Sequence, residues 1–181
     1  RGPTCRAFLR TNEGFLAKAQ RDELDDGTTA VVTLVGAGRM WTANAGDAEA
    51  HAASRTQVQA LTEVHAPDAA AERARVEAAG GAVVWFGKWR VNGVLDVARA
   101  IGDRPLSSAL TAEPYVSAVR APPHEDGADL CVLASDGLWD VVSGEDAGRL
   151  VRECVFLMHL DRVRRRSSGA TPPSAAPPLC S

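Results

Sequence analysis

The clearest candidate for chemistry in this sequence is a pair of aspartates that directly follows an apolar run. Residues 129–135 (DLCVLAS) are rich in apolar side chains, which predicts a buried strand. Asp136 comes immediately after that strand, Gly137 permits a sharp turn, and Asp140 returns toward the same place one turn later. Two carboxylates held close together repel each other unless a cation lies between them. The pair therefore predicts a site for a divalent cation.

Asp47 extends this acidic set. It follows Gly46 at a break after another predicted strand, residues 40–44, so its carboxylate also lies at a strand end. Hard oxygen ligands with room for water are typical of Mg²⁺ or Mn²⁺ sites. Taken alone, each aspartate also suits a turn or a helix cap. Residue type and spacing therefore leave a structural role open beside the metal role.

A glycine-rich turn offers a second candidate, which its spacing excludes. Residues 36–38 (GAG) follow an apolar strand, 28–35, as the loop of a dinucleotide-binding fold does. That fingerprint needs a third glycine three residues on, where the chain has Trp41. The next residues, 40–44 (MWTAN), predict a strand, so no helix N-terminus is available for a pyrophosphate. We interpret the segment as the turn of a hairpin.

The cysteines do not suit a nucleophilic site. Cysteine-based phosphatases place an arginine six positions after the nucleophile, and none of the cysteines with a residue at that distance has one. There is also no CxxC pair or Cys/His cluster with the spacing of a zinc site. Buried, inert thiols in a reducing compartment are the simplest interpretation, which predicts an intracellular location, cytoplasmic or nuclear. The four cysteines are Cys5, Cys131, Cys154 and Cys180.

The elements that must position these residues form blocks rather than a regular alternation of strand and helix. Hairpins followed by separate helices predict an α+β fold of antiparallel sheets covered by helices, and disfavour a doubly wound parallel sheet. Asp68 is expected to cap the middle helix, and Gly80-Gly81 to end it. The predicted helices are 4–24, 68–79 and 144–158, and the predicted strands are 28–35, 40–44, two within 48–62, 82–86 and 129–135.

Composition and charge narrow the class of protein. The 181 residues suit one domain, and a net charge of −3 gives no support for a nucleic-acid binder. No apolar run approaches the roughly 18 residues of a membrane helix. We assign 1–160 to a folded domain and 161–181 to a tail, basic at first and then rich in Ser, Pro and Ala, that is too poor in apolar residues to pack. The basic cluster suits a solvated tail, a nuclear signal or an anionic surface contact.

Seven segments, in the same order, match the motifs of one protein family. They are 26–30 (DGTTA), 43–47 (ANAGD), 61–67 (LTEVHAP), 72–83 (ERARVEAAGGAV), 92–103 (NGVLDVARAIGD), 113–114 (EP) and 133–140 (LASDGLWD). Together they resemble the metal-dependent serine/threonine phosphatases of the type-2C, or PPM, group. Two positions depart from the family pattern: Val64 replaces an Asp, and Ala98 replaces the usual Ser.

The resemblance implies a fold, a cofactor and an activity. The fold would be an α-β-β-α sandwich of two mainly antiparallel sheets flanked by helices. Mg²⁺ or Mn²⁺ would activate a water that hydrolyses phosphoserine and phosphothreonine in phosphoprotein substrates. By position, Asp136 matches a ligand of the paired-metal centre, and Asp47 and Asp140 match ligands of an additional, weaker metal site. The resemblance implies neither a nucleic-acid partner nor a membrane, and leaves the oligomeric state unknown.

Several parts of the family pattern are missing. The chain has no Asp-Gly-His and no Asp-Asn pair, which carry further metal ligands in the family. We therefore expect a phosphatase domain truncated at both ends, with exposed sheet edges and poor solubility. The alternative function is a catalytically inactive phosphatase-like binding module, or a truncated product that lacks a complete metal centre.

Other polar and aromatic residues have structural explanations. Arg99 and Asp103 are expected to form an ion pair or a turn, and His65 to be a hydrogen-bonded structural residue rather than an acid. Trp139 is expected to anchor the turn that carries Asp136. The remaining tryptophans show no stacking pattern for bases and are interpreted as core or loop contacts.

Overall fold

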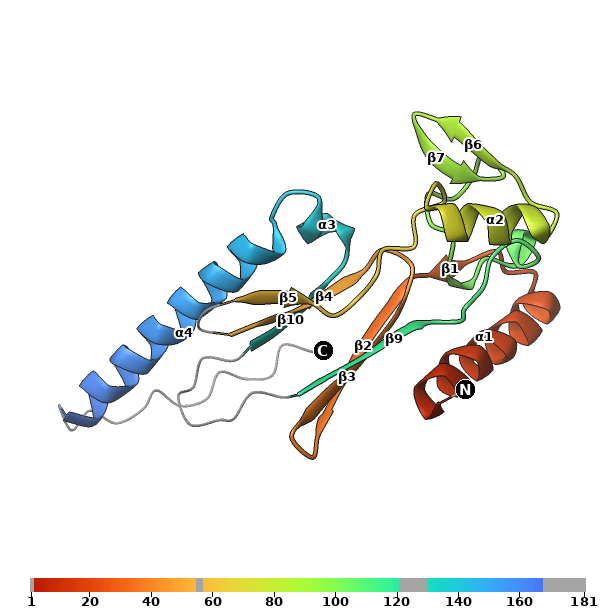
Figure 1. The fold of residues 1–181 in the computed structure, drawn as a ribbon. Helices are drawn as coiled ribbons and strands as arrows, with labels where there is room; N and C mark the ends of the chain where they lie inside the picture. The colour runs from red at the N-terminus through yellow and green to blue at the C-terminus, as the bar shows by residue number, and fades with distance from the viewer. Residues whose placement is uncertain (1, 55–56, 121–129, 168–181) are drawn as a thin grey trace.

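Helices and strands follow one another in blocks along the chain (Figure 1). The computed structural model describes residues 2–54, 57–120 and 130–167. Every pair formed by the named strands is antiparallel, as expected for an α+β protein. The elements are α1 (Pro3–Asp22), β1 (Gly27–Thr28), β2 (Ala30–Gly36), β3 (Arg39–Ala45), β4 (Glu49–Ala53), β5 (Val58–Ala60), α2 (Ala70–Ala78), β6 (Val83–Phe86), β7 (Lys88–Val91), β8 (Ile101–Gly102), the 3₁₀ turn η1 (Arg104–Leu106), β9 (Tyr115–Arg120), β10 (Leu130–Ala134), α3 (Asp136–Trp139) and α4 (Gly144–Ser167).

Two three-stranded sheets form the centre of the molecule. One has the strand order β2-β3-β9 and the other β10-β4-β5. They meet at a core of Met40, Ala50 and Leu61, where the Ser117 hydroxyl of β9 donates a hydrogen bond to the Leu61 carbonyl at 2.6 Å. The β2–β3 hairpin turns at Ala37 and Gly38, both with positive φ, which matches the twist of a tight hairpin. The hairpin interpretation of the glycine-rich turn is confirmed.

A helix covers the outer face of each sheet. Phe8 of α1 is buried against Ala43 and Ala45 of β3. On the other side, α4 lies on β4, β5 and β10, and Gly148 lets it approach closely, since a Cβ there would be 2.7 Å from a Val58 methyl carbon. Figure 1 shows the two helices on opposite sides of the paired sheets. The α-β-β-α order of layers is the one that the family resemblance implied.

A smaller core lies beside the sheets. Helix α2 and the β6–β7 hairpin enclose a cluster that includes Val76, Val83 and Val91, with Leu110 from the segment after η1. The β8 strand pairs with β1, which ties this smaller core to the chain that leads into β2. The β6–β7 hairpin extends from one end of the sandwich (Figure 1).

Three local expectations differ from the structure. Strand β10 is not fully buried, because it is an edge strand of its sheet, and Leu133 is 41% exposed. Asp68 does not cap α2: the cap residue is Ala69, since Asp68 lies inside the turn that the Ala69 amide closes on the Ala66 carbonyl, just before the helix. Cys154, expected to be buried, is exposed on α4.

The C-terminal helix is longer than its predicted range. It continues to Ser167, because the arginines that follow residue 160 are good helix formers. The first residues of the segment assigned to a tail are therefore helical, and the rest of that segment, 168–181, lies outside the described residues. None of the helices in the described ranges combines the length and the apolar character needed to cross a membrane.

Candidate metal centre

Asp136 begins the short helix α3 immediately beyond β10. The Nε1 of Trp139 donates a hydrogen bond to the Ala134 carbonyl at 2.9 Å, and its ring lies against the His51 ring with centroids 4.7 Å apart. The Asp140 amide donates to the Asp136 carbonyl at 2.8 Å. Trp139 therefore fastens α3 to the end of β10, as its predicted anchoring role requires, and both aspartates take their positions from that contact.

Asp47 follows a turn whose backbone conformation requires glycine. Gly46 has a φ of 104°, in the left-handed region, and a Cβ at this position would collide with the side chain of Thr29. The buried Asn44 side chain donates hydrogen bonds from Nδ2 to the carbonyl oxygens of Gly46, at 3.3 Å, and of Glu63, at 2.7 Å. The turn between β3 and β4 is thus fixed from within, and Asp47 leaves it toward the protein surface.

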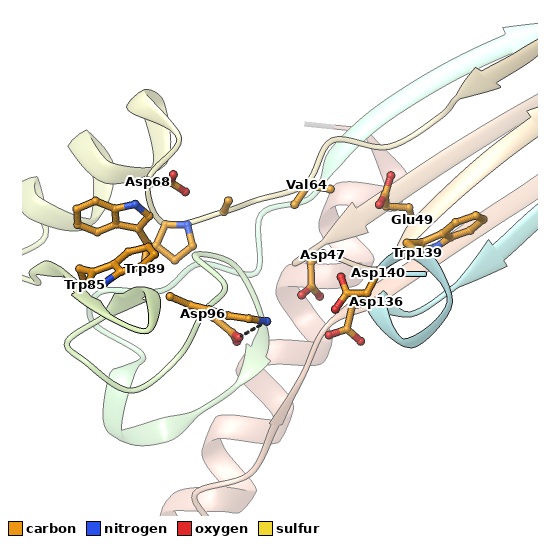
Figure 2. Close-up of a pocket in the computed structure, with 13 residues that line it drawn as sticks. Asp47, Glu49, Val64, Asp68, Trp85, Trp89, Asp96, Asp136, Trp139 and Asp140 are labelled. Atoms are coloured by element: carbon orange, nitrogen blue, oxygen red, sulfur yellow. Dashed lines mark ion pairs between the residues drawn. The ribbon is translucent and has the colours of Figure 1, made fainter. Parts of the chain in front are cut away.

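The three predicted aspartates line one open cavity of about 360 Å³. Figure 2 shows the carboxylates of Asp47, Asp136 and Asp140 gathered on one side of it. They come from the β3–β4 turn and from α3, which are far apart in the chain. The structure therefore brings together all three residues that the sequence analysis selected as metal ligands.

The opposite wall of the cavity is aromatic and carries charges that the sequence analysis missed. Trp85 and Trp89 from the β6–β7 hairpin meet edge to face, with centroids 5.4 Å apart. Trp85 is 63% exposed, which excludes the core role of the two roles, core or loop contact, that the sequence analysis left open for it. The Lys88 ammonium forms an ion pair with Asp96 at 3.5 Å (dashed in Figure 2). Asp96 also lines a second cavity, of about 240 Å³, together with Asp47. It occupies a position that the family motif leaves open, so no sequence signal marked it.

The electrostatics of the cavity centre on Asp47. Burial raises the pKa of this carboxyl above its ordinary value, its own backbone hydrogen bond opposes the rise, and the charges of Asp136, Asp96 and Asp140 add to it. Among the described residues, no lysine or arginine forms an ion pair with Asp47, Asp136 or Asp140. The carboxylates therefore repel one another, and a bound cation would relieve that repulsion.

The donor set suits the Mg²⁺ or Mn²⁺ that the resemblance implies. Carboxylate oxygens are hard ligands, and Mg²⁺ in proteins is commonly held by one or two carboxylates with waters in the other positions. Within the part of the chain that the structure describes, no three Asp, Glu, His or Cys side chains form a group close enough to enclose a metal ion. The fit is therefore to a hydrated ion with few protein ligands and not to a closed cage.

A buried ionic network stands behind the cavity. Arg99 donates two hydrogen bonds to Glu72, one from Nε at 3.0 Å, and a third to the Glu113 carbonyl at 2.8 Å. Arg75 also donates to Glu72, at 3.1 and 3.2 Å. Burial alone would raise the pKa of Glu72, but the hydrogen bonds and charges of the two arginines lower it overall. Arg99 thus has the structural ion pair that the sequence predicted, while Asp103 lies in a left-handed turn.

His65 lies between this network and the Asp47 turn. Its Nδ1 is 3.1 Å from the Gly46 amide nitrogen and 3.0 Å from the Gly46 carbonyl oxygen, and its side chain is buried. The expectation of a hydrogen-bonded structural histidine is confirmed. Burial and the charge of Arg99 lower the pKa of His65 to about 4, so the ring is neutral at neutral pH.

Comparisons with known proteins identify the family of the chain. A family model described as protein phosphatase 2C matches residues 5–170. The chain is 39% identical over 145 residues to probable protein phosphatase 2C 52 of Oryza sativa subsp. japonica, which covers 80% of this chain and 29% of that protein. It is 41% identical over 152 residues to protein phosphatase 1E of Homo sapiens, covering 82% of this chain and 19% of that protein. The chain thus spans less than a third of the length of either relative.

Solved structures show the same similarity in three dimensions. A C. elegans sex determining protein has a TM-score of 0.74 and 31% identity, with 83% of this chain and 39% of that chain covered. Serine-threonine phosphatase 2C from Toxoplasma gondii has a TM-score of 0.73 and 21% identity, with 90% of this chain and 61% of that chain covered, which supports the fold. From the match over residues 5–170 and these similarities, the chain belongs to the protein phosphatase 2C family.

Proposed function

We propose that this chain forms part of a centre that hydrolyses phosphoserine and phosphothreonine in proteins. The single observation that carries the proposal is the convergence of Asp47, Asp136 and Asp140 on one open cavity in a chain of this family. In the proposal these three side chains bind a hydrated Mg²⁺ or Mn²⁺, with one or two of them as direct ligands and the remainder bound through the waters of the ion. Such an ion, when bound, supplies an activated water and neutralises charge on the phosphoryl oxygens.

The contribution of the chain is to hold the carboxylates before any ion arrives. Asp136 and Asp140 are held by the Trp139 contact with β10, and Asp47 by the turn at Gly46. Ligands fixed by packing need little reorganisation on binding, which favours both affinity and defined geometry. Burial and the neighbouring carboxylates raise the pKa of Asp47, and a bound cation would offset that unfavourable environment for its negative charge.

The open form of the cavity suits a large substrate. Its aromatic wall, Trp85 and Trp89, faces the aspartates across space that a phosphorylated side chain of another protein could enter (Figure 2). We infer phosphoprotein substrates from this shape together with the family. An intracellular location, cytoplasmic or nuclear, stays a prediction from the cysteines.

A second function is favoured by a specific observation. Among the described residues, no three metal-binding side chains come close enough to hold a metal ion together. The sequence also has no Asp-Gly-His to supply further ligands. A chain without a complete set of metal ligands would serve as a phosphatase-like module that binds a partner without turnover. The two functions predict opposite outcomes in one assay.

The assay uses the 181-residue chain, Mn²⁺ and an aryl phosphate. If the chain is an enzyme, turnover appears with Mn²⁺, disappears with EDTA, and falls on the order of 100-fold in Asp136→Ala. Loss of a ligand should cost at least as much as the roughly 10–100-fold typical when a residue that hydrogen-bonds a metal ligand is changed. Asp22→Ala, the same substitution at an exposed site on α1, should leave the rate unchanged. No turnover in the folded wild type supports the binding module. Turnover that survives Asp136→Ala overturns the site assignment.

A further inference from the structure

The turn that presents Asp47 is held by a side chain that does not line the cavity. The cavity is lined by the neighbours of His65 in the sequence, Val64 and Ala66, but not by His65 itself, which is only 2% exposed. We propose that His65 is a positioning residue that fixes the Gly46–Asp47 turn, and through it the Asp47 carboxylate, by accepting a hydrogen bond from the Gly46 amide.

The direction of that hydrogen bond follows from the other partners of Gly46. The Gly46 carbonyl already accepts hydrogen bonds from the His65 amide at 3.1 Å and from the Asn44 side chain at 3.3 Å. The Gly46 amide has His65 Nδ1 as its partner at 3.1 Å. If Nδ1 carried the proton instead, the buried Gly46 N–H would lose its acceptor, at a cost of roughly 1–3 kcal/mol. Nε2 is buried without a partner among the described residues in either tautomer, so a proton on Nε2 leaves one group unpaired, whereas a proton on Nδ1 leaves both Nε2 and the Gly46 N–H unpaired. The geometry therefore favours Nδ1 as acceptor and Nε2 as the protonated nitrogen.

The surroundings of the ring keep it available as an acceptor. An imidazolium has no lone pair to accept a hydrogen bond, so the contact with the Gly46 amide exists only while the ring is neutral. Arg99 lies close enough for its charge to disfavour a second proton on His65, and burial acts in the same direction. The ring thus stays neutral, which the proposed contact requires.

His65 is itself fastened to the buried network. The Ala98 amide donates to the His65 carbonyl at 2.8 Å, and Arg75 donates to the Ala98 carbonyl at 2.5 Å. Arg75 in turn binds Glu72. A continuous set of hydrogen bonds therefore runs from helix α2, through the segment before β8, to the turn at Gly46. A residue placed in this way can transmit the rigidity of the core to Asp47.

The first test needs no metal. In the wild-type chain, the Gly46 amide should exchange with solvent deuterium slowly, because it is buried and bonded to His65. In His65→Leu, which has no acceptor, its exchange should rise more than that of amides in β3. In His65→Asn, whose side-chain oxygen can accept in place of Nδ1, protection should return. Rapid exchange of Gly46 in the wild type, or equal protection in the Leu and wild-type chains, overturns the proposal.

The second test measures affinity for Mn²⁺ by titration calorimetry and rests on the proposed function. His65→Leu should weaken binding by about tenfold, as is typical when a residue that supports a metal ligand is lost, and His65→Asn should recover most of the affinity. Ser117→Ala, which removes a hydrogen bond between the sheets, is the matched control: it should lower stability without changing Mn²⁺ affinity. If it weakens Mn²⁺ binding as much as His65→Leu does, the effect is general loosening and positioning by His65 is refuted.

The two tests fail in distinguishable ways. A protected Gly46 amide with no Mn²⁺ binding in the wild type would overturn the proposed metal centre while keeping the role of His65 in the turn. Mn²⁺ binding that is equally strong in His65→Leu would overturn the positioning role while keeping the metal centre. Where His65→Leu fails to fold, His65→Asn keeps the proposal falsifiable, because Gly46 exchange or Mn²⁺ affinity that departs from the wild type by as much as is expected for His65→Leu would overturn it.

Discussion

Two carboxylates in this fold, Glu72 and Asp47, have opposite environments. Glu72 is buried, with two arginines donating to it, and its pKa is lowered. Asp47 is partly buried, has other carboxylates around it instead of arginines, and its pKa is raised. The same chemical group therefore serves a structural role where its charge is satisfied internally, and is suited to bind a cation where it is not. A carboxyl pKa that is perturbed by burial and by neighbouring negative charges, as that of Asp47 is, is typical of functional sites.

The comparison predicts the largest loss of stability at Glu72. Glu72→Gln keeps the shape of the side chain but leaves two partly buried arginines without a counter-charge. We expect the free energy of unfolding to fall by about 3 kcal/mol, the lower end for a broken buried ion pair. Urea denaturation monitored by tryptophan fluorescence would measure it.

The matched control for this substitution is on the same helix. Glu77 pairs with Arg73 at the surface, where the Glu77 side chain is 53% exposed. Glu77→Gln should cost about 0.5 kcal/mol or less, because exposed ion pairs contribute little. Equal losses at Glu72 and Glu77 would show that the network is not a distinct structural element, and would remove the contrast with Asp47.

His65 gives the next largest effect, through pH. Its pKa is lowered from 6.5 to about 4 in the folded chain, so the unfolded chain binds more protons in that interval. The contribution of the neutral ring is fully present above pH 6.5 and is lost as the pH falls from 6.5 toward 4, by up to about 3 kcal/mol. The slope of stability against pH should therefore be flatter in His65→Asn.

The comparison of slopes isolates His65 from the other titrating groups. Glu72 and Asp47 also titrate in acid, with opposite signs, but they are present in both chains and their contributions cancel in the difference. Urea denaturation at several pH values between 4 and 7 gives both curves. Parallel curves for wild type and His65→Asn would contradict a buried neutral histidine.

The sequence predicted the parts of the site that local structure determines. Asp136 and Asp140 could be found because a strand, a turn and a short helix are consecutive in the chain, and Asp47 because a glycine interrupts a strand just before it. Asp96 and Lys88 could not, since their position depends on how the β6–β7 hairpin packs beside the sheets. Spacing within one segment contains no information on that packing.

The same limit explains the errors in the fold. The apolar composition of β10 predicted burial, but only the strand order shows that β10 lies at a sheet edge. Asp68 had the residue type of a helix cap, but the turn closed between Ala66 and Ala69 moved the helix start beyond it. Antiparallel sheets covered by helices were predictable, because hairpin turns and separate helical segments restrict the choice strongly, while the α-β-β-α layer order was implied by the family resemblance.

The smallest effect on stability should come from Asp47 itself, and its sign separates the two kinds of carboxylate most sharply. Asp47→Asn removes a negative charge that is partly buried and repelled by Asp136, Asp96 and Asp140. In the absence of divalent cations we expect the chain to gain stability, on the order of 1 kcal/mol, where Glu72→Gln loses it. The same change should abolish the stabilisation that Mn²⁺ confers on the wild type, because binding to the folded state alone raises stability by mass action.

Thermal melts with EDTA and with Mn²⁺ measure both quantities in one series. If Asp47→Asn instead destabilises the metal-free chain as Glu72→Gln does, Asp47 is a structural carboxylate and the contrast drawn here fails. If it stabilises the chain and still responds to Mn²⁺, Asp47 is repelled as described but is not a ligand.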